Sequence, residues 1–196
     1  MRLFTEMTEL VTVGQYLDMR IASAPLYDLE GQLDAIRATM RAKTASYTAE
    51  FPLAMGASAA LGDGSHVAAA RAAGLPAGIA FQLRDDLLGV FGRQELTGKS
   101  TRSDLDGRKL TPLMSFALAS SHGPALRALL AHAPLDDESA DRVRAILVES
   151  GARAYVEQLI DENVRRAIQQ AELAPIPRRL RGELRLAALE AGERER

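Results

Sequence analysis

Apolar residues recur along most of this chain at the three- and four-residue spacing of an amphipathic helix. The clearest example is the stripe formed by Val156, Ile160, Val164 and Ile168. No segment alternates between apolar and polar residues over the length of a strand, and no Asn-Gly or Asp-Gly pair joins two β-rich runs. The pattern therefore predicts an all-α protein.

The same periodicity and its interruptions predict where each helix begins and ends. Helices are expected over residues 5–22, 28–48, 50–61, 65–91, 111–121, 124–132, 137–150, 152–173 and 177–190. Gly74-Leu75-Pro76 predicts a kink or a break in the fourth helix, because proline lacks an N–H and its ring crowds the preceding turn. The longest non-helical stretch is expected between Gly92 and Lys109, and such loops in a helical domain are more often functional than idle.

Length, charge and cysteine content exclude several classes of protein. The 196 residues fit one domain or a large piece of one, and the net charge of −2 argues against a general nucleic-acid binder. The absence of cysteine excludes disulfides and thiolate metal sites. No apolar run approaches the ~20 residues of a membrane span, and the N-terminus lacks the features of a secretory signal. We therefore expect a cytoplasmic protein with no transmembrane segment and no nucleic-acid partner.

Lysine is scarce, which draws attention to the positions where it occurs. Only Lys43, Lys99 and Lys109 are lysines among the 24 basic residues. Lysine presents a compact, strongly hydrated ammonium, whereas arginine presents a planar fork of donors. The three lysines are therefore the positions at which to look for a site that uses a compact cation.

The candidate chemistry is concentrated at an acidic pair inside an apolar helix. Asp85 and Asp86 lie in its C-terminal half, where the helix dipole disfavours negative charge. Helical spacing puts Phe81 on the face of Asp85 and Gln82 on the face of Asp86. Two carboxylates suit Mg²⁺ that carries a diphosphate, because Mg²⁺ takes one or two protein carboxylates and fills its octahedron with phosphate and water oxygens. The alternative is a solvated pair on an exposed face.

A second acidic cluster has a simpler explanation. Asp136-Asp137-Glu138 follows a proline and opens a predicted helix. At that place an aspartate caps the helix and the other carboxylates complement its dipole. We assign this cluster no catalytic role.

Four blocks of sequence resemble one known family. The segments GIAFQLRDDLLGVFG and TGKSTRSDLDGRKLTP closely resemble the second aspartate-rich region of the trans-isoprenyl diphosphate synthases, or polyprenyl synthetases. Gly14-Gln15-Tyr16-Leu17-Asp18 is similar to the GQ-x-LD helix of that family, and Lys43-Thr44-Ala45 to its KT helix. The blocks follow the family's order between residue 6 and about residue 115. The variant DDLLG is similar to geranylgeranyl-type bacterial synthases within a family that also includes farnesyl-type enzymes.

This resemblance implies the helical isoprenoid synthase fold and a magnesium-dependent prenyl transferase. The reaction it implies is the 1'-4 condensation of isopentenyl diphosphate with an allylic diphosphate. It implies that Asp85 and Asp86 hold Mg²⁺ and that Gln82 supports them. Contacts with the diphosphate or the allylic group are implied for Gln15, Lys43, Thr44, Phe81, Gln82, Lys99 and Lys109. Catalytic roles are implied for Lys43, Gln82 and Lys99.

The chain departs from the family pattern in two respects. Gly89 stands at the third carboxylate of the second motif, and Arg93 stands where relatives often have aspartate. The first motif, DDxx(xx)D, is absent from the chain. We therefore expect residues 1–196 to be the C-terminal part of a single domain, with the N-terminal helices missing and little or no activity alone. Uncovered apolar faces would then favour a homodimer or a heteromer with a synthase subunit.

Two alternatives stay open at this point. One is a non-catalytic, synthase-like subunit that binds an intact synthase, which the absent first motif favours. The other is a class I terpene cyclase, which shares the fold but uses a different second metal motif from FQ-x-x-DD followed by GK. The length of the product chain is not predicted by these residues.

Overall fold

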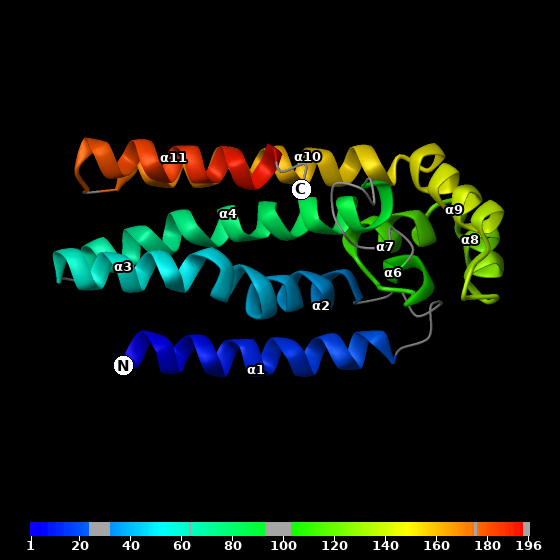
Figure 1. Cartoon of the computed structure of the whole chain (residues 1–196), viewed down its shortest axis with the longest axis horizontal. Helices are drawn as coiled ribbons and strands as arrows, with labels where there is room; N and C mark the ends of the chain where they lie inside the picture. The colour runs from blue at the N-terminus through cyan, green and yellow to red at the C-terminus, as the bar shows by residue number, and fades with distance from the viewer. Residues whose placement is uncertain (24–31, 63, 93–102, 175, 194–196) are drawn as a thin grey trace. The chain divides into compact units, whose positions relative to one another are not determined.

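The computed structural model describes residues 1–23, 32–62, 64–92, 103–174 and 176–193. Within these ranges every regular element is a helix, so the all-α prediction is confirmed. In chain order the elements are α1 (Arg2–Ala22), α2 (Gln32–Thr39), η1 (Met40–Glu50), α3 (Phe51–Leu61), α4 (Gly64–Phe91), α6 (Ser103–Asp106), α7 (Pro112–Ala119), α8 (Gly123–Leu130), α9 (Asp137–Glu149), α10 (Ala152–Leu173) and α11 (Arg178–Glu193) (Figure 1). No helix among the described residues combines the length and the apolar character needed to cross a bilayer.

Most of the predicted helix ends agree closely with the observed ones. The start expected at residue 28 lies outside the described residues. The boundary expected between residues 48 and 50 is not a gap, because α2, η1 and α3 follow one another without a break. η1 is a π-helix, and the backbone returns to the α form at Phe51. The predicted non-helical stretch before Lys109 is wrong for Ser103–Asp106, which form α6.

Of the kink or break predicted near Gly74-Leu75-Pro76, the break does not occur, because α4 continues from Gly64 to Phe91. The kink stays a prediction. Proline removes one backbone N–H and leaves the carbonyl one turn earlier without its usual partner. That carbonyl belongs to Ala72, which is an exposed residue. The helix therefore tolerates the proline.

Gly74 is a packing residue and not a helix breaker. A Cβ atom added to Gly74 would lie 2.9 Å from the carbonyl oxygen of Ala49. One turn later, a Cβ added to Gly78 would lie 2.7 Å from the Cα of Ala45. These two glycines allow the backbone of α4 to approach η1 more closely than any side chain would permit.

Two compact units make up the chain. Unit 1 comprises Met1–Asp18, Ala38–Arg84 and Leu159–Arg194, and unit 2 comprises Met19–Arg37, Asp85–Gln158 and Glu195–Arg196. The expectation of one domain over residues 1–196 stays a prediction.

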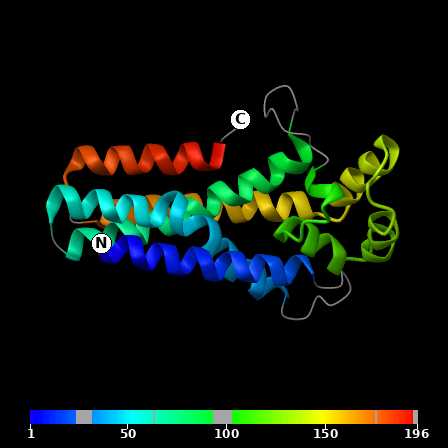
Figure 2. The ribbon, with the colours of Figure 1, turned by 60° about the horizontal axis from the view of Figure 1, so that its bottom comes forward.

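In unit 1 the helices run side by side and pack through small residues. Figure 1 shows α1 beside η1 and α3, with α4 next to them. A Cβ added to Gly14 of α1 would overlap the backbone nitrogen of Lys43 in η1, so these two helices also meet backbone to backbone. Gly192 of α11 instead packs on a side chain of α10, because a Cβ added there would lie 2.7 Å from Cγ2 of Val164. Figures 1 and 2 both place the end of α3 and the start of α11 at the same end of this unit.

Unit 2 buries an aliphatic core between α6, α7, α8, α9 and the start of α10. Its fully buried residues include Leu105, Leu113, Leu118, Leu126, Leu130, Val143, Ile146, Leu147 and Val156. The rings of Phe116 and Tyr155 stack with their centroids 4.6 Å apart. Asp106 at the end of α6 accepts a hydrogen bond from the backbone N–H of Leu135 at 2.8 Å, which ties α6 to the segment before α9.

The predicted role of the second acidic cluster is confirmed at its first residue. Asp136 has extended backbone angles and is the N-cap of α9. Its Oδ1 accepts a hydrogen bond from the backbone N–H of Ser139 at 2.8 Å. Asp137 and Glu138 lie in the first turn, where the helix dipole favours negative charge.

Candidate functional site

The adjacent carboxylates of α4 differ in burial. Asp86 is only 3% exposed, whereas Asp85 is half-buried. A buried carboxylate is unfavourable unless it is paired and hydrogen-bonded. Asp86 meets this requirement through Lys109, whose Nζ lies 2.9 Å from Asp86 Oδ1. The solvated-pair alternative is therefore wrong for Asp86.

The turn after α6 brings Lys109 back to α4. Arg108 has a φ of 49°, a left-handed conformation that reverses the chain there. The backbone N–H of Lys109 then donates to the carbonyl oxygen of Asp104 at 3.0 Å. The ammonium of Lys109 also lies 3.6 Å from Asp104 Oδ2, so it stands between two carboxylates from different helices.

These carboxylates keep Lys109 charged. Burial by itself lowers the pKa of the ammonium, but the negative charges of Asp86, Asp104 and Asp85 and the hydrogen bond to Asp86 raise it more. The net effect raises the pKa of Lys109 well above its ordinary value. Lys109 is consequently a permanent cation at physiological pH.

Asp104 also occupies the space beside Gly89. A Cβ atom added to Gly89 would overlap the carboxylate of Asp104. Gly89 is the position at which the family motif has its third carboxylate. In this chain a carboxylate from α6 therefore lies next to the position where the family motif has its third carboxylate and this chain has glycine.

The acidic pair fits a magnesium ion that arrives with a diphosphate better than one held by the protein alone. Among the residues that the structure describes, no group of three or more His, Cys, Asp or Glu side chains is arranged to hold a metal ion. Mg²⁺ needs only one or two carboxylates when phosphate oxygens and waters complete its coordination. Asp85 is the more accessible of the two carboxylates, since Asp86 is buried against Lys109.

In unit 1 the GQ-x-LD and KT blocks lie together. Lys43 and Thr44 are on η1, and the ammonium of Lys43 forms an ion pair with Asp18 at the end of the GQ-x-LD block. Thr44 is buried, and Gln15 is exposed on α1. η1 is an 11-residue π-helix and carries the whole KT block, Lys43-Thr44-Ala45.

Phe81 and Gln82 lie on α4 and are both half-buried. Phe81 lines a groove in unit 1 together with residues of η1 and α11. Lys99 lies outside the described residues. The structure thus assigns five of the predicted site residues to unit 1 and three to unit 2. They are Gln15, Lys43, Thr44, Phe81 and Gln82 in unit 1, and Asp85, Asp86 and Lys109 in unit 2.

Two side chains of the site were missed from the sequence. Asp18 and Asp104 both belong to segments that match the family, but their carboxylates received no role there. Asp18 pairs with Lys43, and Asp104 lies between Gly89 and Lys109. The sequence shows only that each is an acidic residue within a segment that matches the family. It does not show which residue each one pairs with.

Comparison with known proteins identifies the family. A family model described as Polyprenyl synthetase matches residues 1–149. The geranylfarnesyl diphosphate synthase of Aeropyrum pernix is 38% identical over 94 residues, which cover 48% of this chain and 29% of that protein. The geranylgeranyl diphosphate synthase of Mycobacterium tuberculosis is 31% identical over 159 residues, or 80% of this chain and 44% of that protein. The chain thus spans less than half of the length of either relative.

Solved structures resemble the whole chain. A geranylgeranyl pyrophosphate synthase of Corynebacterium glutamicum, in complex with isoprenyl diphosphate and magnesium, is 31% identical with a TM-score of 0.86. The similarity covers 100% of this chain and 55% of that one. A polyprenyl synthase of Caulobacter crescentus, in complex with calcium and isoprenyl diphosphate, has a TM-score of 0.85 at 23% identity, covering 100% of this chain and 58% of that one. The fold is therefore that of these synthases, and the chain belongs to the polyprenyl synthetase family.

Proposed function

We propose that this chain binds the allylic diphosphate of a prenyl transfer reaction and stabilises the diphosphate as it departs. The observation that carries the proposal is the placement of the Lys109 ammonium 2.9 Å from Asp86 Oδ1, beside the accessible Asp85. A carboxylate pair and a permanent cation together match a diphosphate that carries Mg²⁺. The names of the similar synthases, and the isoprenyl diphosphate and magnesium in the Corynebacterium structure, support the same ligand.

In the reaction the bond between the allylic carbon and the diphosphate oxygen breaks, and its electron pair leaves with the oxygen. The terminal alkene carbon of isopentenyl diphosphate then bonds to the allylic carbon, and a proton is lost. Bound magnesium supplies positive charge that favours the departing diphosphate. The residues of this chain contribute fixed charges at the place where negative charge develops.

Each site residue has a proposed role. Asp85 and Asp86 would hold Mg²⁺, and Gln82 would support them. In the absence of ligand, Lys109 serves as the counter-ion of Asp86, and its partly exposed ammonium would be available to a phosphate oxygen of a bound diphosphate. Further contacts with the diphosphate or the allylic group come from Gln15, Lys43, Thr44, Phe81 and Lys99. Because the chain carries no first aspartate-rich motif, we expect it to bind ligand but to turn over weakly by itself.

Exposed apolar residues on α1 support association with a second copy of the chain. Phe4, Val13 and Tyr16 are each more than half exposed, although all three are large and apolar. Light scattering coupled to size exclusion should show a dimer that Phe4→Ser/Tyr16→Ser weakens. A wild-type monomer at all concentrations contradicts this part of the proposal.

The ligand proposal is tested by calorimetry with farnesyl diphosphate in the presence and absence of Mg²⁺. The comparison uses the wild-type chain, Asp85→Ala/Asp86→Ala and the control Asp137→Ala/Glu138→Ala, which removes two exposed carboxylates at the start of α9. Circular dichroism verifies that each variant is folded.

Magnesium-dependent binding by the wild type and the control, with loss in Asp85→Ala/Asp86→Ala, supports the proposal. No binding by a folded wild-type chain overturns it and favours the non-catalytic subunit.

A further inference from the structure

The segment that joins α10 to α11 lies at one end of unit 1, and its charge differs from that of the rest of the chain. Residues 173–182 include Arg178, Arg179 and Arg181 and no acidic residue. We call the described residues of this segment, 173–174 and 176–182, the basic corner. Its charge of +3 contrasts with the net charge of −2 of the whole chain. A local excess of positive charge attracts anionic surfaces.

The stability of α11 does not explain two of these arginines. Arg178 and Arg179 are the first residues of the helix, and both are exposed. The beginning of a helix carries a partial positive charge, so cations are unfavourable there. Within the part of the chain that the structure describes, neither guanidinium has an ion-pair partner. Their positions therefore favour a role toward something outside the chain.

Exposed leucines accompany the arginines. Leu173 at the end of α10 is 72% exposed, and Leu180 in the first turn of α11 is 41% exposed. α3 ends with the exposed Leu61, and Figures 1 and 2 both place the end of α3 and the start of α11 at the same end of the unit. Apolar area is unfavourable in water. This end of unit 1 therefore presents both cations and uncovered aliphatic side chains.

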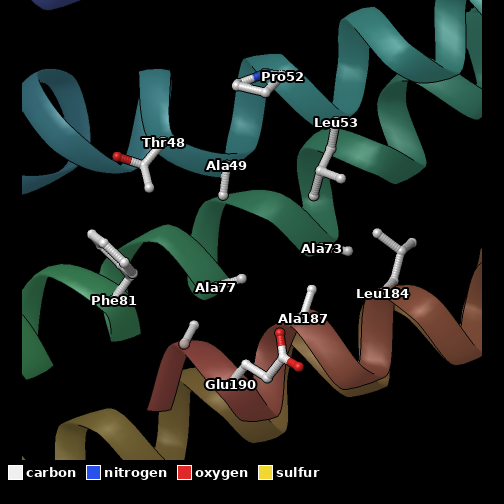
Figure 3. A pocket seen from close by; sticks show the side chains of 11 residues that line it. Thr48, Ala49, Pro52, Leu53, Ala73, Ala77, Phe81, Leu184, Ala187 and Glu190 are labelled. Atoms are coloured by element: carbon white, nitrogen blue, oxygen red, sulfur yellow. The ribbon is translucent and has the colours of Figure 1, made fainter. Parts of the chain in front are cut away.

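The basic corner is held by contacts that do not involve Arg178 or Arg179. The backbone N–H of Arg181 donates to the carbonyl oxygen of Pro177 at 3.2 Å, and its Nη2 donates to the carbonyl oxygen of Ile176 at 3.2 Å. Ala174 is buried. Later residues of α11 line the groove of unit 1 shown in Figure 3, but none of the basic corner does. The corner is thus a separate surface with a defined shape.

We propose that the basic corner docks on the surface of a lipid bilayer that contains anionic lipids. Arg178 and Arg179 would lie at the level of the lipid phosphates, because the stem of arginine is apolar and its head is a cation. Leu173 and Leu180 would enter the boundary between the headgroups and the acyl chains. Positive charge and buried apolar area are the two contributions that hold a protein on such a surface.

The small size of the basic corner favours a bilayer over a macromolecular partner. A stable protein interface takes roughly 20–30 residues from each side, whereas the corner has nine described residues. A nucleic acid needs a longer basic stripe, but the exposed Glu172 and Glu183 flank this one. A bilayer needs no surface of matching shape, so a few arginines and leucines are enough to engage it.

The test is sedimentation of the full chain with vesicles. The vesicles contain either phosphatidylcholine alone or an equal mixture of phosphatidylcholine and phosphatidylglycerol. Two variants alter the basic corner, namely Arg178→Gln/Arg179→Gln and Leu173→Ser/Leu180→Ser. None of these residues is among the proposed contacts with the diphosphate, so magnesium-dependent ligand binding should be unchanged in both variants.

Each variant has a matched control elsewhere in unit 1. Arg165→Gln/Arg166→Gln removes two exposed arginines from the middle of α10. Leu186→Ser removes an exposed leucine farther along α11. Circular dichroism verifies that all variants are folded.

We expect the wild-type chain to sediment with the anionic vesicles and not with phosphatidylcholine alone. Arg178→Gln/Arg179→Gln should lower the partition coefficient by about tenfold or more, since each basic residue near an anionic surface contributes about fivefold. Leu173→Ser/Leu180→Ser should also lower it, and the controls should change it by less than about twofold. Added salt should weaken binding, because it screens the arginines.

Three results would overturn the proposal. One is equal sedimentation with both kinds of vesicle. Another is a corner variant that weakens binding no more than its control does. The third is binding to poly-glutamate and not to vesicles, with loss in Arg178→Gln/Arg179→Gln, which would assign the basic corner to an acidic protein partner.

Discussion

Lys109 and Asp86 are 23 residues apart in the chain, yet Lys109 Nζ lies 2.9 Å from Asp86 Oδ1. Asp86 is nearly completely buried, whereas the side chain of Lys109 is 41% exposed. The carboxylate therefore depends on the pair more than the ammonium does, because only the carboxylate would be left in a poorly hydrated place without its partner. This asymmetry makes Lys109 able to leave for a ligand, provided that another cation replaces it at Asp86.

The asymmetry predicts how the pair contributes to stability. Lys109→Met should lower the free energy of unfolding by about 1–3 kcal/mol, because the buried Asp86 then loses its hydrogen bond and ion pair with the Lys109 ammonium. In a double-mutant cycle with Asp86→Asn, the double variant should lose less stability than the sum of the two single losses. The difference should be about 0.5–3 kcal/mol. Urea unfolding provides the measurement.

Arg142→Met is the reference for that cycle, since Arg142 and Glu149 form an ion pair with side chains 57% and 46% exposed. An exposed pair should contribute less than about 1 kcal/mol. Equal effects of Lys109→Met and Arg142→Met would show that Asp86 does not depend on Lys109.

The pKa of Lys109 is predicted to lie above its ordinary value of 10.5. Because the folded pKa exceeds the unfolded one, the stabilisation from charged Lys109 is fully present below the unfolded pKa. It is lost only as the pH rises through the folded pKa. Between pH 6 and 9 the pair should therefore contribute a constant amount to stability.

This prediction is measured by NMR titration of ¹³C-labelled lysines. The chain has only three lysines, so single Lys→Arg variants assign each signal. Asp86→Asn should move the midpoint of Lys109 downward. A midpoint at or below 10.5 in the wild-type chain contradicts the geometry of the pair.

Gly14→Ala is predicted to destabilise unit 1 by about 1–3 kcal/mol, the usual effect of overpacking. The added Cβ would overlap the backbone nitrogen of Lys43, and a backbone cannot move aside as a side-chain end can. Gly56→Ala in α3 is the control, because a Cβ there meets nothing within 4 Å. The control should gain about 1 kcal/mol from helix propensity. Thermal unfolding that gives both variants the same sign would exclude the close α1–η1 contact.

Gly89→Ala is predicted to gain little or no stability while Asp104 is present. The helix propensity of alanine is worth about 1 kcal/mol, but the new Cβ must displace the Asp104 carboxylate from beside Lys109. In the background of Asp104→Ala the same change should recover the full gain. If Gly89→Ala is equally stabilising in both backgrounds under urea unfolding, Asp104 does not occupy that space.

The helices of this protein could be predicted from the sequence because their signals are local. Each stripe of apolar residues lies within one helix, and the N-cap formed by Asp136 involves a backbone N–H only three residues away. The resemblance to the family rests on ordered blocks of residues, which are also read directly along the chain. For these reasons the helix boundaries, the family and the position of the acidic pair were available without a structure.

The tertiary structure decided the meaning of residues whose partners are distant in sequence. From the sequence, Gly74 was expected to interrupt its helix. In the structure it allows the backbone of α4 to pack closely against the backbone of η1. In the sequence, Asp104 is one acidic residue among several. In the structure, α6 places it between Gly89 and Lys109. Likewise, nothing local distinguishes Ala187 from any other helical alanine, although it faces the groove of unit 1. Periodicity states which face of a helix is apolar, whereas only the packing of helices determines what that face contacts.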